Sequence, residues 1–212
     1  MQQQESKAYA ELTQALCTLA DSCAEVEGAW LLGGSCGLWL QGVSLAAAPR
    51  DIDVYADLAT AARLHERLQP FATDQPRHDR SGLYSSQLSH YRIGESTVEL
   101  VGGFEVRTAR ALYRTEVDLI LAPAAQRVTL RDTALSVMPL AHELVFNLLR
   151  ERPDRYLAIA AMIRREPERH MPLLDELLKR NEWSAELVGR LAELLDRPLL
   201  SRPWREHRGG EA

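Results

Sequence analysis

Two short stretches of the 212-residue chain decide how it folds: AWLLGGS at residues 29–35 and DIDVYA at residues 51–56. The first is an apolar run that ends in two glycines, a pattern typical of a buried strand that turns sharply into a helix. In the second, charged and bulky residues alternate, which predicts a strand with one face in a core and the other face outside it. Together they predict a strand, a tight turn, a short helix over residues 35–41 and a second strand.

The rest of the first 138 residues continues this mixed pattern. Amphipathic spacing predicts helices over residues 6–24 and 60–68, with Asp57 as the N-cap of the second helix. Further strands are expected at residues 85–93, 97–101, 116–121 and 127–130. The polar stretch 71–81 contains Pro76 and is expected to be a loop. We therefore expect a mixed β-sheet with flanking helices in this part of the chain.

Beyond Pro139 the apolar residues recur only at helical spacing, which predicts a bundle of helices. The expected fold class is thus α+β, a mixed sheet with flanking helices followed by a C-terminal helical bundle. We place the domain boundary between residues 1–138 and 139–212. The tail from Arg197 on is rich in proline and glycine and is expected to be frayed.

Composition and charge narrow the possible functions. The chain has 25 Lys and Arg against 30 Asp and Glu, a net charge of −5, and neither part has the basic excess typical of proteins that follow a nucleic-acid backbone. We therefore find no strong nucleic-acid signature. No apolar run is long enough to span a membrane, and the first residues do not form a secretory signal. Three cysteines without metal-binding spacing favour a reducing, cytoplasmic environment.

The acidic residues carry the main chemical signal. Asp51 and Asp53 lie two residues apart on a strand, so both carboxylates point to one face, where they repel unless a divalent cation lies between them. Magnesium, which prefers oxygen ligands, is the expected ion. Glu99 fits the same face, because its neighbours Val98 and Leu100 point into the core. Asp118 is a competing choice for this third carboxylate, and three such groups can hold two metal ions for nucleotidyl transfer.

The glycine turn provides a second signal. Gly33 and Gly34 allow a phosphate to approach the backbone closely, and the Ser35 hydroxyl adds a donor. Arg50, next to Asp51, is a candidate for neutralising a phosphate. By contrast, His142-Glu143 begins a helix but does not complete a zinc motif, because Phe146 stands where the second histidine is needed.

In these motifs the chain resembles the nucleotidyltransferase superfamily typified by DNA polymerase beta. The resemblance rests on LGGS at 32–35, DIDV at 51–54 and VEL at 98–100. It is greatest to the small bacterial members, which include minimal, antibiotic and toxin nucleotidyltransferases. In some of these, the helical part carries an Arg-x-Lys-Asp-type stretch, of which residues 152–158 keep the arginine but not the Lys-Asp order.

The resemblance implies a mixed sheet with the active site at its edge, a nucleoside triphosphate donor and two Mg²⁺ ions. It implies transfer of a nucleoside monophosphate to an acceptor hydroxyl, with release of pyrophosphate. Asp51, Asp53 and Glu99 would be the catalytic and metal-binding residues. The acceptor is left open as a small molecule, a tRNA or a protein. Two other functions stay open: a non-catalytic nucleotide-binding module, and an interaction protein that uses only its helical bundle.

Overall fold

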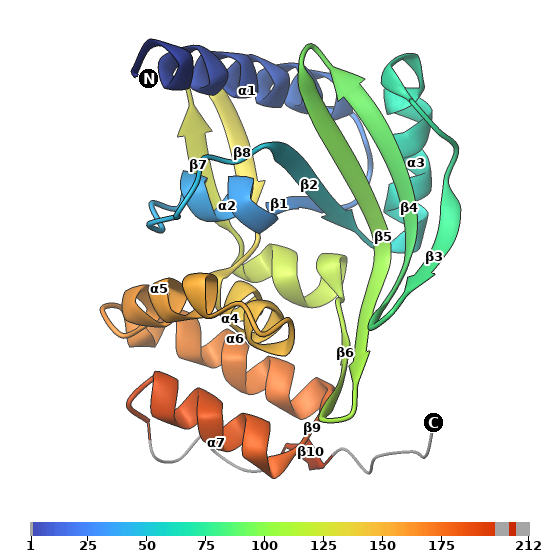
Figure 1. Ribbon diagram of the computed structural model, residues 1–212. Coiled ribbons are helices and arrows are strands. Elements are labelled where there is room, and N and C mark those ends of the chain that lie inside the picture. Colours follow the sequence, from blue (N-terminus) through green and yellow to red (C-terminus); the bar gives the residue numbers. More distant parts are fainter. Residues whose placement is uncertain (1, 198–203, 207–212) are drawn as a thin grey trace.

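The chain folds around one mixed sheet with helices on both faces, in a computed structural model that describes residues 2–197 and 204–206 (Figure 1). The strands are β1 (Trp30–Gly33), β2 (Asp51–Ala56), β3 (Arg77–Ser81), β4 (Tyr84–Ile93), β5 (Ser96–Thr108), β6 (Ala111–Arg114), β7 (Gln126–Leu130), β8 (Thr133–Val137), β9 (Glu182–Trp183) and β10 (Arg205–Glu206). The helices are α1 (Gln2–Cys23), α2 (Gly34–Leu40), α3 (Leu58–Leu68), α4 (Leu140–Leu149), α5 (Pro153–Ile163), α6 (Pro167–Arg180) and α7 (Ala185–Leu194).

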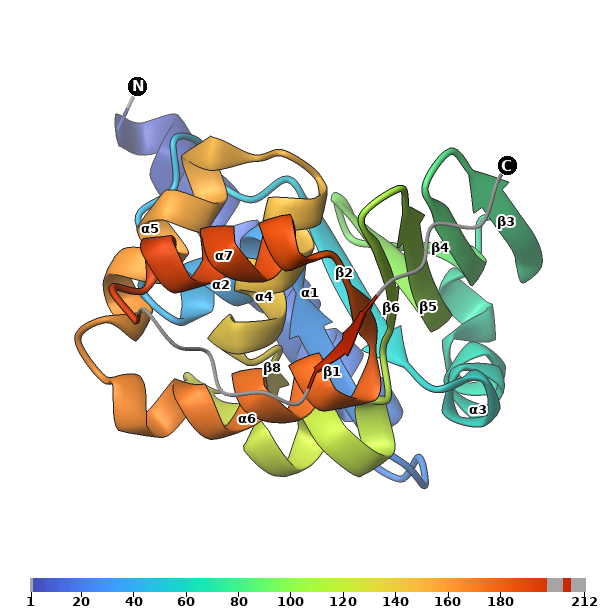
Figure 2. The same cartoon turned by 90° about the horizontal axis from the view of Figure 1, so that it is seen from below.

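Strand β2 lies at the centre of the sheet, antiparallel to β1 and parallel to β5. The expected order of strand, turn, short helix and strand over β1, α2 and β2 is confirmed. On its other edge β5 pairs with β4, which in turn carries β3. Figure 2 shows the four C-terminal helices gathered on one side of the β2–β5 pair, with β3 and β4 on the other side.

Two hydrophobic cores lie on opposite faces of this sheet. Ile52 and Val54 of β2 are fully buried and pack with α1 and α3 on one face, as the alternation in the sequence predicts. Tyr55, whose side chain points the other way, belongs to the second core, which includes helices α4 to α7. Because burial of apolar area is the main favourable term in folding, these two cores fix which face of β2 each carboxylate occupies.

A β-bulge in strand β5 changes which of its side chains face each core. Val98 and Leu100 pack in the first core, whereas Phe104 and Val106 pack in the second. Between them, Gly103 has φ +59, and the pairing with β4 slips at the same level. The extra residue of a bulge reverses which face later side chains occupy. The strand expected to end at Val101 therefore continues for another seven residues to Thr108.

Two local predictions are wrong, and a third holds only in part. Residues 77–81 form edge strand β3 rather than a loop. Residues 117–121 form a π-helical turn rather than a strand, and β7 pairs with β8 instead. Asp57 is the N-cap residue of α3, as predicted, but its side chain makes no capping bond, because its carboxylate accepts hydrogen bonds from the backbone amides of Val117 and Asp118 (both 3.0 Å). This long-range contact replaces the local one.

The sheet and the second core both continue across the boundary proposed at residue 138. Strand β9, from the helical part, pairs with β6, and Trp183 of β9 packs against Tyr113 with ring centroids 5.5 Å apart. A division into two folding units stays a prediction. Of the tail that was expected to be frayed, residues 198–203 and 207–212 lie outside the described part. Among the described helices, none is long and apolar enough to cross a membrane.

The shared core predicts that the chain unfolds in one transition and that Trp183 is a large contributor to it. Trp183 is fully buried and its indole N–H donates to the Leu178 carbonyl (3.1 Å). We expect Trp183→Ala to lower the free energy of unfolding by about 3–5 kcal/mol. Leu119→Ala, at a position 63% exposed, should change it by less than about 0.5 kcal/mol.

Urea unfolding followed by tryptophan fluorescence and by far-UV circular dichroism measures both effects. The two probes should report the same midpoint. Two transitions, of which Trp183→Ala shifts only one, would instead show that residues 1–138 fold independently of the helices.

Candidate active site

Four residues of the candidate site form a row across neighbouring strands. Gly33 of β1 pairs with Asp53 of β2, Asp53 pairs with Glu99 of β5, and Glu99 pairs with His90 of β4. Asp51 lies two residues from Asp53 on the same face. The structure therefore brings together the three carboxylates that the sequence singled out.

The electrostatics of this row are unfavourable for ionised carboxylates. Burial first, and then the neighbouring charges of Asp51 and Glu99, raise the pKa of Asp53 to about 7. Arg150 and Arg155 act in the opposite direction with smaller effects. A perturbed carboxyl group of this kind in a cleft marks a candidate functional site.

The glycine turn lies directly against these acids. Gly34 has φ +58, and a Cβ atom placed on it would lie 1.8 Å from Asp53 Oδ2. Only glycine therefore fits beside the carboxylate in this conformation. The Ser35 hydroxyl donates to Asp51 Oδ1 over 3.5 Å. The expected phosphate-binding residues Gly33, Gly34 and Ser35 are thus neighbours of the carboxylates, although the amide of Gly34 already has a partner.

That partner is Glu143 of α4, whose role sequence reasoning missed. The Gly34 amide donates to Glu143 Oε1 over 2.9 Å, and the Asn147 side-chain amide donates to Glu143 Oε2 over 3.1 Å. Glu143 is only 1% exposed, and its burial raises the pKa of its carboxyl group to about 7. The sequence signal available was an acidic residue inside a largely apolar helix.

Two adjoining cavities meet at the carboxylates. The first, of about 340 Å³, contains three arginines that we call the basic lobe: Arg50, Arg152 and Arg155. Ser35 and Asp51 line this cavity as well. Of these three arginines, only Arg50 was expected here from the sequence. Arg152 is held by Asp154 through two hydrogen bonds of 2.9 and 2.7 Å.

The second cavity, of about 300 Å³, has an aromatic wall. Tyr84, Phe104 and Phe146 pack together here, with Tyr84 stacked on Phe104 at 5.8 Å and Phe146 edge-on to Phe104 at 5.2 Å. We call these three residues the aromatic wall. The guanidinium of Arg150 lies over Phe146, 4.8 Å from the ring centre. Ser35, Asp51 and Arg155 line both cavities, so one continuous cleft passes the carboxylates.

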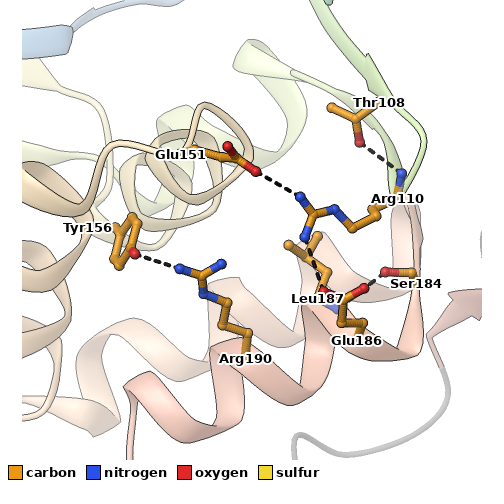
Figure 3. Close-up of polar contacts among 8 residues, drawn as sticks. All are labelled: Thr108, Arg110, Glu151, Tyr156, Ser184, Glu186, Leu187 and Arg190. Atoms are coloured by element: carbon orange, nitrogen blue, oxygen red, sulfur yellow. Dashed lines mark hydrogen bonds and ion pairs between the residues drawn. The ribbon is translucent and has the colours of Figure 1, made fainter.

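A network of ion pairs anchors the turn that carries Arg150 and Arg152. Glu151, between them, has φ +54 and pairs with Arg110 (2.8 Å), which also pairs with Glu186 of α7 (3.2 Å). Figure 3 shows Arg110 reaching from the β5–β6 turn to both glutamates. Exposed pairs of this kind contribute little stability singly, but here they hold one turn to two other elements.

Other titratable residues near the carboxylates lie elsewhere or take other roles. Asp118, the competing third carboxylate, accepts hydrogen bonds from the Ala29 amide (2.5 Å) and from the Thr60 hydroxyl (3.4 Å), and it does not line either cavity. Cys36 is buried, and burial raises the pKa of its thiol to about 12, which fits a core residue. His90 contacts Asp74 through its Nδ1 atom (2.7 Å), with its Nε2 atom 3.9 Å from Glu99.

The expected metal site has no ready-made cluster of ligands. Within residues 2–197 and 204–206, no group of three or more His, Cys, Asp or Glu side chains is arranged so that it could hold a metal ion. The three carboxylates share a face and a cleft, but binding by all three stays a prediction.

The contact between Gly34 and Asp53 predicts a stability difference between two glycines. Gly34→Ala adds a methyl group against the carboxylate, whereas Gly42→Ala adds one in open space at a similar φ of +77. Both variants carry the strain of a left-handed alanine, on the order of 1 kcal/mol. Because of the overpacking at residue 34, Gly34→Ala should lower the free energy of unfolding by at least about 1 kcal/mol more than Gly42→Ala does. Equal urea midpoints would mean that Asp53 simply moves aside.

The raised pKa of Asp53 predicts a pH-dependent stability. Between its unfolded pKa near 4 and its folded pKa near 7, the folded state binds more protons than the unfolded state, so this group's contribution to stability falls as the pH rises. Asp53→Asn removes that loss. The variant should match the wild type near pH 4 and exceed it above pH 7 by at least about 1.4 kcal/mol, the equivalent of one pKa unit. Urea unfolding across this pH range tests it, and a difference that does not change with pH would contradict the burial of a proton-binding Asp53.

Comparisons with known proteins bear on the fold. No protein-family model matches the chain. No curated protein matches its sequence. Among solved structures, a candidate nucleotidyltransferase of Thermotoga maritima (TM1012) superposes with a TM-score of 0.58 and 20% identity, over 75% of this chain and 94% of that one.

Two further solved structures are more distant. ANT(2")-Ia in complex with adenylyl-2"-tobramycin has a TM-score of 0.48 and 9% identity, over 78% of this chain and 96% of its own. The lincosamide antibiotic adenylyltransferase LnuA has a TM-score of 0.43 and 11% identity, over 68% and 94%. With the T. maritima superposition, the mixed sheet and its flanking helices identify the architecture of this chain as the nucleotidyltransferase fold.

Proposed function

We propose that the protein is a Mg²⁺-dependent nucleotidyltransferase that moves a nucleoside monophosphate from a nucleoside triphosphate to an acceptor hydroxyl. The observation that carries the proposal is the position of Asp51, Asp53 and Glu99 on one face of β2 and β5, where the two cavities meet. Acids between a basic and an aromatic cavity suit a reaction in which an anionic donor and an acceptor meet at one point.

The donor is proposed to occupy the basic lobe. Arg50, Arg152 and Arg155 offer planar guanidinium groups that suit phosphate oxygens. Ser35 at the edge of this lobe adds a hydroxyl donor. In this proposal the α-phosphorus would lie near the carboxylates and the pyrophosphate among the arginines.

The carboxylates fit a magnesium site by their chemistry. All are oxygen donors, and the mutual repulsion that raises the pKa of Asp53 is the kind that a bound cation relieves. Asp51 and Asp53 would hold the ion that accompanies the triphosphate, and Glu99 would complete a second site. Magnesium bound there supplies neutralisation of phosphate charge and a lower pKa for the acceptor hydroxyl.

In the proposed reaction the acceptor hydroxyl oxygen forms a bond to the α-phosphorus, and the bond to the β-phosphate oxygen breaks. Glu99 takes the hydroxyl proton and passes it to solvent. Pyrophosphate, which carries the charges of the β- and γ-phosphates, leaves through the basic lobe.

The acceptor is proposed to enter along the aromatic wall. At about 300 Å³ this cavity has the size of a small-molecule site, and its flat rings suit a ring or an apolar face of the acceptor. The net charge of −5 gives no support for a bulky nucleic acid. A small hydroxylated molecule is therefore the acceptor class that we propose.

The test is transfer of label from each of four α-labelled triphosphates with Mg²⁺, in the presence of a cell extract separated into small-molecule, RNA and protein fractions. Label in the small-molecule fraction, with release of pyrophosphate, is the expected result. Label in the RNA or protein fraction would overturn the acceptor class but keep the reaction. No labelled product and no nucleotide binding would overturn the reaction itself.

Glu99 and Asp118 provide matched variants for this assay. Glu99→Gln should lower kcat by roughly 10²-fold or more, because it removes the proton acceptor. Its affinity for a non-hydrolysable triphosphate should change little, since Asp51 and Asp53 remain. Asp118→Asn should keep its activity, because Asp118 bonds only to backbone and Thr60 groups outside the cleft.

Calorimetry and initial rates separate the possible outcomes. An inactive Asp118→Asn variant together with a normal Glu99→Gln variant would show that Asp118, and not Glu99, is the third carboxylate. Nucleotide binding without turnover in the wild type, unaffected by either change, would favour a non-catalytic nucleotide-binding module.

A further inference from the structure

Glu143 places a carboxylate inside a hydrophobic core, where apolar side chains are the rule. All ten residues of α4 are buried, and Glu143 is 1% exposed in the middle of the helix. Leaving a carboxylate inside a core costs free energy unless its oxygens have partners. Both oxygens of Glu143 do have partners, and one of these is the turn of the candidate active site.

The bond to Gly34 connects elements that are distant in sequence. Glu143 Oε1 accepts the Gly34 amide, the first amide of α2, across a separation of 109 residues. Helix α2 has Gly33 at its N-cap, which makes no side-chain cap bond. Glu143 thus satisfies one of the first amides of α2, which have no partner within the helix. Asn147, one turn later in α4, holds the second carboxylate oxygen in place.

Gly34 in turn touches the candidate catalytic acid. The Asp53 carboxylate occupies the space that a side chain on Gly34 would fill, with Oδ2 1.8 Å from that Cβ position. Gly33 is confined as well, because its own Cβ would lie 2.7 Å from the Tyr55 ring and 3.2 Å from Glu143 Oε1. A shift of this turn would therefore change the wall against which Asp53 rests.

We infer that Glu143 is a positioning residue of the active site: its bond to Gly34 holds the glycine turn against Asp53 and makes α4 a part of the catalytic machinery. The inference rests on the proposed nucleotidyl transfer for its kinetic consequence, but the tether itself exists without substrate. Glu143 lines neither cavity of the cleft and would act only through Gly34 and Asp53.

The test compares variants of the full chain that differ in whether residue 143 can accept a hydrogen bond. Glu143→Gln keeps an acceptor oxygen, and Glu143→Met keeps length and flexibility without one. His142→Leu is the matched control, because His142 is equally buried in α4 but bonds to Tyr113 (2.5 Å) rather than to the turn. If Glu143→Met does not fold, Glu143→Asp, whose carboxylate is one methylene shorter, takes its place.

The first readout is the amide hydrogen exchange of Gly34 relative to Cys36 in the same helix, measured by NMR without substrate. We expect exchange at Gly34 to rise roughly tenfold or more in Glu143→Met and to stay near the wild type in Glu143→Gln and His142→Leu. Unchanged Gly34 exchange in Glu143→Met would overturn the tether.

The second readout is the kinetics of transfer. Glu143→Met should lower kcat about tenfold or more while the KM for triphosphate stays within a small factor, and Glu143→Gln should restore most of the rate. A Glu143→Met enzyme with loosened Gly34 and normal kcat would overturn the positioning role. If the wild type transfers nothing but the exchange pattern holds, the proposed function fails and the tether stands.

Discussion

The parallel register of β2 on β5 is the constraint on which the site depends. Ile52 lies opposite Val98, and Val54 lies opposite Leu100, so four apolar side chains enter the first core together. A slip of one residue would send them to the other face. The same register sets Asp53 opposite Glu99. The free energy of burying the apolar residues therefore holds like charges side by side that would separate if they were free to do so.

The C-terminal helices supply most of the positive charge in the cleft. The sheet presents the carboxylates, and the arginines that line the cleft with them come, apart from Arg50 beside β2, from the end of α4 and the start of α5, as Arg150, Arg152 and Arg155. The turn between these helices is held from outside by Arg110 and from inside by Phe146, on which Arg150 lies. The helical part therefore forms one wall of the cleft, and a search for partners of the helices alone would miss this role.

The sequence was sufficient for the centre of the fold and insufficient for its edges. Residues 51–56 alternate so clearly that both the strand and the face of each carboxylate follow from them. Residues 77–81 are polar throughout and form a strand only because β4 offers a partner edge. Val117, Leu119 and Leu121 alternate like a strand, but 117 and 121 also share one face of a helical turn, with Leu119 at the surface. The hydrogen bonds from the Val117 and Asp118 amides to Asp57 favour the helical turn over the strand.

The site was predictable to a similar degree. Asp51, Asp53, Glu99 and the glycine turn stand in short motifs, and the structure brings them together. Arg155 has no local signal, and Glu143 has only its place in a largely apolar helix, because the relation of both residues to the cleft depends on how α4 and α5 pack. Their roles arise from contacts across about half the chain, such as the 109 residues that separate Gly34 from Glu143.

The bulge at Gly103 divides β5 into two segments with opposite parity. Even-numbered residues face the first core before it, as Leu100 does, and the second core after it, as Phe104 does. Evolution can exchange side chains along this strand one at a time, but deletion of a single residue here would shift the parity of everything up to Thr108. Phe104 would then leave the cleft. A change of length in the exposed turn at residues 82–83 would instead leave the residue count along β5 unchanged.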